Sequence, residues 1–162
     1  MRLYRIDPNR HAVTQAMVLA LHRVTVRPEP AKKGDWRGEL GELPTPEVSR
    51  PITTWMAPVQ LEGVPLPPGT RLQCANYYPP GGGIGWHTDF AYPGWRVYVH
   101  TSDAPGTVFR YGNDTILEGT VGGYVFETGP ACWHALVSAG HRLACGLQIP
   151  PALANELVAA TR

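Results

Sequence analysis

The chain has 162 residues, a length that suits one compact domain with a hydrophobic core. Its hydrophobic content of 43% and formal net charge of +1 exclude a disordered chain and give no overall attraction to nucleic acids or acidic lipids. No apolar run reaches the length of a membrane span, and the first residues lack the apolar core of a signal peptide. We therefore expect a cytoplasmic protein that does not bind membranes.

The first predicted element is a helix over residues 7–22. Asp7 is a plausible N-cap, Pro8 suits the first helical position, and apolar residues then recur on one face. Residues 23–27 alternate weakly between apolar and polar side chains, which predicts a short strand.

A long segment rich in proline and charge follows, from residue 28 to 69. This composition predicts mostly loop, with one element near Ile52–Val59. We expect residues 1–69 as a whole to supply the helix and loops that cover one end of a barrel.

From Thr70 onward the pattern changes to short strands separated by glycine, proline and other turn residues. Near-regular spacing of such strands predicts a closed all-β sandwich or barrel, such as a jelly roll, over residues 70–149. Residues 150–162 read as a tail that contains a short helix, and residues 1–162 as a single domain. The expected strands are 70–78, 84–89, 95–102, 107–111, 115–120, 122–128, 132–138 and 142–149.

His87 and Asp89 lie two residues apart in one of these strands. Side chains alternate between the two faces of a strand, so an imidazole and a carboxylate at this spacing project from the same side and can bind one ion. The pair alone carries little weight, because such pairs also occur by coincidence on protein surfaces.

His134 strengthens the interpretation, because it lies in a second predicted strand late in the barrel. Two histidines and one carboxylate form the facial triad of non-haem Fe(II) oxygenases, which leaves coordination positions open for substrate and O2. The sequence therefore predicts a metal site made of His87, Asp89 and His134, which would also be the catalytic residues.

Arg142 begins the strand that returns after His134, and Ala144 and Gly146 share its face. A buried guanidinium needs an anionic partner, and small neighbours leave room for a ligand. A dicarboxylate with one end on the metal and the other on Arg142 meets both conditions. The alternative at this point is an arginine that pairs with a carboxylate of the protein or is solvated at the strand end.

Together, His87-x-Asp89, His134 and Arg142 resemble the motif of the 2-oxoglutarate/Fe(II)-dependent dioxygenase superfamily, over roughly residues 70–149. The stretch from Asn76 to Asp89 is similar to the AlkB-like branch, and the interval between His134 and Arg142 to prolyl-hydroxylase-like members. The chain also resembles small oxygenases of phage and bacterial genomes.

The resemblance implies a mainly β fold, the double-stranded β-helix or jelly roll, here with an N-terminal helix and a short C-terminal helix. It implies Fe(II) and O2 as cofactors, 2-oxoglutarate as co-substrate, and succinate and CO2 as co-products. By resemblance, Asn76 and Tyr78 would hydrogen-bond 2-oxoglutarate, and Arg142 would pair with its distal carboxylate. The reaction would be a hydroxylation or an oxidative demethylation of a nucleobase, a protein side chain or a small metabolite.

Several alternatives stay open on the sequence. One is a cupin-like metal enzyme that does not use 2-oxoglutarate, and another is a β-barrel that binds ligands without catalysis. Arg96 and Arg110 lie in strands and are candidates for contacting an anionic substrate. His100 is a candidate third metal ligand if His134 is not one.

Overall fold

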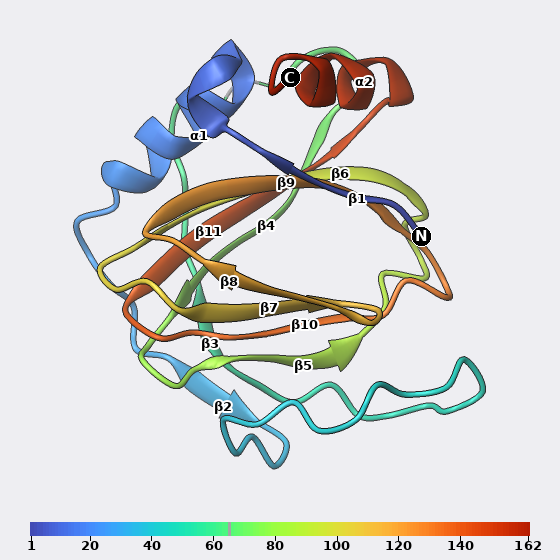
Figure 1. Cartoon of the computed structure of the whole chain (residues 1–162). Coiled ribbons are helices and arrows are strands. Elements are labelled where there is room, and N and C mark those ends of the chain that lie inside the picture. The colour runs from blue at the N-terminus through green and yellow to red at the C-terminus, as the bar shows by residue number, and fades with distance from the viewer. Residues whose placement is uncertain (65) are drawn as a thin grey trace.

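The computed structural model describes residues 1–64 and 66–162, which form a mainly antiparallel β structure with two α-helices (Figure 1). The helices are α1 (Ala12–His22) and α2 (Pro151–Ala159), and a 3-10 turn spans Pro8–Arg10. The strands are β1 (Leu3–Ile6), β2 (Ala31–Lys33), β3 (Thr54–Pro58), β4 (Arg71–Tyr78), β5 (Gly83–His87), β6 (Gly94–Ser102), β7 (Thr107–Tyr111), β8 (Asp114–Glu118), β9 (Val121–Thr128), β10 (His134–Val137) and β11 (Arg142–Ile149).

The strands form one curled sheet with the order β1-β9-β6-β11-β4-β3-β5-β10-β7-β8, while β2 pairs with β3. The sheet bends at β3, which pairs with β4 on one side and β5 on the other. Figure 1 shows the result as a half-barrel, with β6, β9 and β11 on one side of the interior and β5, β7 and β10 on the other.

Strand β6 shows how alternation divides the core in two. Val97 and Val99 belong to an apolar cluster on the outer face of the sheet, where residues of α1 and α2 also pack. Tyr98, between them in sequence, points the other way into an aromatic cluster inside the half-barrel. Along the strand, every second side chain therefore lines the interior, and the side chains between them pack against the helices.

The two helices lie on the same outer face of the sheet, α1 over β6 and β11 and α2 over β6, β1 and β9 (Figure 1). Within the described residues, no helix is long and apolar enough to cross a membrane. The helix expected over residues 7–22 is interrupted at its start. Asp7 caps the 3-10 turn by accepting a hydrogen bond from the Asn9 amide, and α1 begins only after His11, whose Nδ1 accepts from the Val13 amide.

The expected strands between residues 70 and 149 are confirmed, apart from shifts of a few residues at their ends. The strand expected over residues 23–27 is wrong, because that segment makes no ladder and follows α1 as irregular chain. Strands β1 and β2 were not expected from the sequence. Both are short, and their pairing with β9 and β3 depends on partners far away in the chain.

Candidate metal centre

The register of two antiparallel strands brings the two histidines together. His87 is the last residue of β5, His134 is the first of β10, and the two are direct partners in the ladder. Their rings lie with centroids 4.1 Å apart. Strand pairing thus brings together two histidines that 46 residues separate in the sequence. The spacing alone does not reveal this contact.

Asp89 joins them from the loop that leaves β5. It lies beyond the end of the strand, so the expectation of a strand reaching residue 89 was too long by two residues. One carboxylate oxygen of Asp89 is 3.3 Å from Nε2 of His134. One ligand atom from each of His87, Asp89 and His134 lies within 4.8 Å of the others, so the group can hold a metal ion.

Backbone carbonyls orient both imidazoles. Nδ1 of His87 is 2.9 Å from the carbonyl oxygen of Gly85, and Nδ1 of His134 is 2.9 Å from that of Cys132. A carbonyl only accepts, so each Nδ1 carries a proton, which leaves Nε2 as the ring nitrogen available to a metal. This is the arrangement that prepares a histidine to bind a metal through Nε2.

Electrostatics also favour the metal-binding protonation states. Burial, with a further effect of His134, lowers the pKa of His87 to about 3, so its ring is neutral at pH 7. Burial alone would raise the pKa of Asp89. The hydrogen bond and charge of His134, together with the charge of Arg96, outweigh it and lower the pKa below its usual value. The site therefore offers a neutral imidazole at His87 and an ionised carboxylate at Asp89.

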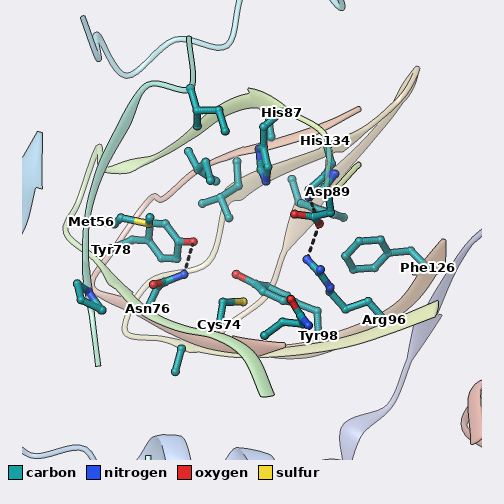
Figure 2. A pocket seen from close by; sticks show the side chains of 18 of the residues that line it. Met56, Cys74, Asn76, Tyr78, His87, Asp89, Arg96, Tyr98, Phe126 and His134 are labelled. Atoms are coloured by element: carbon teal, nitrogen blue, oxygen red, sulfur yellow. Dashed lines mark hydrogen bonds and ion pairs between the residues drawn. The ribbon is translucent and has the colours of Figure 1, made fainter. Parts of the chain in front are cut away.

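These three residues stand at the wall of a cavity of about 620 Å³ inside the half-barrel. Figure 2 shows Asn76, Tyr78 and Tyr98 across the cavity from the metal-binding group. Asn76 and Tyr78 come from β4, and the Asn76 amide lies 3.5 Å from the Tyr78 hydroxyl. The structure thus brings the expected ligand-binding pair Asn76 and Tyr78 into the same space as the expected metal ligands.

Arg96, a candidate for substrate contact, also lines this cavity and is only 7% exposed. Its Nη1 donates a hydrogen bond to Oδ2 of Asp89 (Figure 2). Its Nε is buried and has no hydrogen-bond partner among the residues that the structure describes. Arg96 therefore holds the Asp89 carboxylate and keeps one buried donor without a partner.

Arg142 lies elsewhere, and its anionic partner in the structure is a carboxylate of the protein, the alternative that the sequence left open. Its side chain is fully buried, and Nε and Nη2 donate to the two carboxylate oxygens of Glu118 at 2.8 and 2.9 Å. Arg142 is not among the described residues that line the cavity. Nor is there free space beside Gly146, where an added Cβ would lie within 3.1–3.5 Å of Cys74, Tyr98 and Arg96.

Tyr98 connects Arg142 with the cavity, and the sequence reasoning missed it. Nη1 of Arg142 donates to the Tyr98 hydroxyl at 3.1 Å, which leaves the hydroxyl proton free for another acceptor. Burial raises the pKa of Tyr98 despite the opposing charge of Arg142, and burial raises that of Tyr78 as well. Both phenols are therefore protonated donors at neutral pH. Alternation from Arg96 along β6 could have indicated Tyr98, whereas no sequence signal links Glu118 to Arg142.

The two other candidates lie outside the cavity lining. Arg110 stacks over the Trp86 ring at 4.8 Å, and its Nη1 donates to the carbonyl of Gly41. His100 is 1% exposed and borders a separate, smaller pocket. Its role as a third metal ligand is not supported, because the metal-binding group found within the described residues contains His134 instead.

Neither the models of known protein families, nor the curated proteins, nor the solved structures contain a match to this chain.

Proposed function

We propose that this protein is an Fe(II)- and 2-oxoglutarate-dependent oxygenase that hydroxylates, or oxidatively demethylates, an organic substrate. The observation that carries the proposal is the placement of His87, Asp89 and His134 at the wall of a large cavity whose opposite wall presents protonated hydroxyls and an amide. A metal site of this kind needs room beside the ion for a chelating co-substrate, and the cavity provides it.

The order of strand pairing supports a jelly roll, the fold that the sequence resemblance implies. Strand β4 pairs with β11, β5 with β10, β6 with β9, and β7 with β8. This nested pairing is that of a long hairpin wound into two facing layers, with both metal-binding histidines on one layer and Asn76, Tyr78, Arg96 and Tyr98 on the other.

The donor set fits Fe(II). Two imidazoles and one carboxylate leave half of an octahedral coordination sphere open, whereas structural zinc sites are closed by four protein ligands. When bound, Fe(II) with 2-oxoglutarate supplies O2 activation, in which one oxygen atom enters succinate, CO2 is released, and the other oxygen atom enters the substrate C–H bond.

The cavity also fits a dicarboxylate. The unpartnered Nε of Arg96 is a buried donor that a carboxylate would satisfy, since leaving it unpaired costs free energy. The Tyr78 and Tyr98 hydroxyls and the Asn76 amide offer further donors across the cavity. Arg142 does not line the cavity and acts through Tyr98. Its hydrogen bond to the Tyr98 oxygen leaves the hydroxyl proton to be donated to another acceptor, such as the co-substrate. Direct pairing of Arg142 with 2-oxoglutarate stays a prediction.

Each residue then has a defined task. His87 and His134 bind the ion through Nε2 while the Gly85 and Cys132 carbonyls keep their rings in place. Arg96 holds the Asp89 carboxylate against the histidines, which limits its rotation. Apolar side chains such as Phe109, Phe126 and Leu136 line the same cavity and exclude water from the reacting atoms.

The test is succinate formation by purified protein. Protein loaded anaerobically with Fe(II) and 2-oxoglutarate should release succinate slowly after O2 is added, even without substrate, and His134→Ala protein should release none. A cupin-like enzyme that does not use 2-oxoglutarate would bind the metal but form no succinate. That result, with iron stoichiometrically bound, would overturn the proposal.

A further inference from the structure

The cavity at the metal site has two unlike parts. Around the metal-binding group its wall combines polar groups, namely Asp89, Arg96 and the phenols, with apolar rings such as Phe126. Six other residues of the lining are apolar apart from one phenol, and we call them the outer wall. It consists of Ile52, Met56, Pro58, Val59, Leu72 and Tyr92.

Charge is confined to the polar part. Among the described residues that line the cavity, Asp89 is the one carboxylate and Arg96 the one arginine or lysine. A divalent ion and Arg96 together carry three positive charges, and Asp89 with a bound dicarboxylate carries three negative ones. Arg142 and Glu118 neutralise each other behind the wall. No further charged side chain lines the outer part among the described residues, and burying an uncompensated ionic group there is costly. Arg71 lies beside the outer wall, where it is exposed and its guanidinium stands 4.7 Å over the Tyr92 ring.

The mouth of the cavity is apolar as well. Ile52, Leu72 and Tyr92 belong to the outer wall and are nevertheless 41%, 39% and 46% exposed. Large apolar side chains gathered at an opening, rather than scattered singly, mark a binding surface for an apolar partner.

We propose that the substrate is an uncharged, mainly apolar small molecule, which enters over the outer wall and presents a C–H bond to the metal site. The oxidation step rests on the proposed function: R–H, O2 and 2-oxoglutarate give R–OH, succinate and CO2. The cavity of about 620 Å³ lies within the range of small-molecule pockets, about 300–1,000 Å³, with space for the co-substrate and one further compact ligand. A nucleic acid would instead require several cations beside the opening.

A binding experiment tests the site without relying on turnover. Protein loaded with Zn(II) and 2-oxoglutarate is titrated with N-phenyl-1-naphthylamine, an uncharged apolar fluorophore. We expect saturable fluorescence enhancement, and Leu72→Glu and Ile52→Lys should each raise the dissociation constant at least ten-fold, although their charges are opposite. Leu117→Glu is the matched control, since Leu117 is 65% exposed on β8 and does not line the cavity. Unfolding midpoints of all variants show that they are folded.

The apolar site is overturned if the wild type gives no saturable enhancement, or if Leu117→Glu weakens binding as much as Leu72→Glu does.

A turnover experiment then addresses the substrate. Succinate release by the Fe(II) protein is measured with uncharged compounds (indole, 1-octanol, N-acetyl-leucine amide) and with charged ones (AMP, single-stranded DNA, free lysine). Uncharged compounds should raise the rate several-fold, and Leu72→Glu should abolish this stimulation, whereas Leu117→Glu should keep it. Stimulation by the charged compounds alone would overturn the substrate class. If no protein releases succinate, the oxygenase proposal fails, and the fluorophore titration still decides the apolar site.

Discussion

Two buried clusters in this protein contain the same three residue types, an arginine, a carboxylate and a histidine. One is Arg96, Asp89 and His134 at the cavity, and the other is Arg142, Glu118 and His100, which the cavity does not reach. In the cavity cluster the side chains of Arg96 and Asp89 are 8% and 20% exposed, whereas those of Arg142 and Glu118 are 0% and 1% exposed. The two clusters therefore contain the same residue types but differ in how accessible their side chains are to a ligand.

The difference lies in how the carboxylate is used. Both oxygens of Glu118 accept from the Arg142 guanidinium in a bidentate pair, which leaves His100 near Glu118 without a hydrogen bond. Oδ2 of Asp89 meets one nitrogen of Arg96, and Arg96 keeps an unpartnered Nε. A closed ion pair stabilises one arrangement of the chain, while an open one can accept an ion and a ligand.

The largest expected effect comes from opening the closed cluster. Glu118→Gln leaves the Arg142 charge buried without a counter-ion, so we expect a loss of about 3–5 kcal/mol in the free energy of unfolding, measured by urea denaturation. The double variant Glu118→Leu with Arg142→Met removes both charges and should be clearly more stable than Glu118→Gln. If the single variant unfolds at the wild-type urea concentration, the pair is not structural.

The matching change in the open cluster should affect metal binding instead. His134→Ala removes one of three ligands, so the affinity for Fe(II) or Zn(II) should fall at least about 100-fold, which corresponds to about 2.7 kcal/mol. Isothermal titration of the metal measures it, and His141→Ala is a control outside the cavity lining. Unchanged affinity in His134→Ala would exclude His134 as a ligand.

The histidine of the closed cluster should make stability depend on pH. Burial, and secondly the charge of Arg142, lowers the pKa of His100 to about 2, whereas an unfolded histidine titrates near about 6.5. Between these pH values the unfolded chain binds one more proton than the folded chain. The contribution of neutral His100 to the free energy of unfolding is therefore complete above about pH 6.5, and it falls by about 1.4 kcal/mol per pH unit below that. Urea unfolding at pH 6, 5 and 4 should show that the free energy of unfolding changes less with pH in His100→Gln than in the wild type. Equal slopes would contradict the assignment.

The smallest effect is expected for the arginine that belongs to neither cluster. Arg110→Gln loses a stacking contact with Trp86 and one hydrogen bond to a carbonyl, so stability should fall by about 0.5–1 kcal/mol. The affinity of the Zn(II)-loaded protein for 2-oxoglutarate should not change, whereas Arg96→Met should weaken it. A loss of affinity in Arg110→Gln as large as in Arg96→Met would mean that the cavity extends to Arg110.

Local pattern was sufficient for most of the β structure and for the metal-binding residues. The alternation and turn residues after Thr70 predict strands that match β4 to β11, because both signals act within a few residues. His87 and Asp89 were found because they are two residues apart, and His134 because it lies in a predicted strand late in the barrel. Strand β1 could not be predicted from so short a segment, since it exists by pairing with β9 more than a hundred residues later.

The sequence by itself determined which side chains are available and on which strand face they lie. The tertiary structure decided which of them meet. Arg142 and Glu118 are 24 residues apart and pair because the half-barrel interior brings them into contact, and that contact satisfies the guanidinium that the sequence left for a ligand. Arg96 became the buried arginine facing the metal-binding group for the same reason. Charges in a closed interior pair with whatever lies within a few ångströms, and chain spacing does not encode that distance.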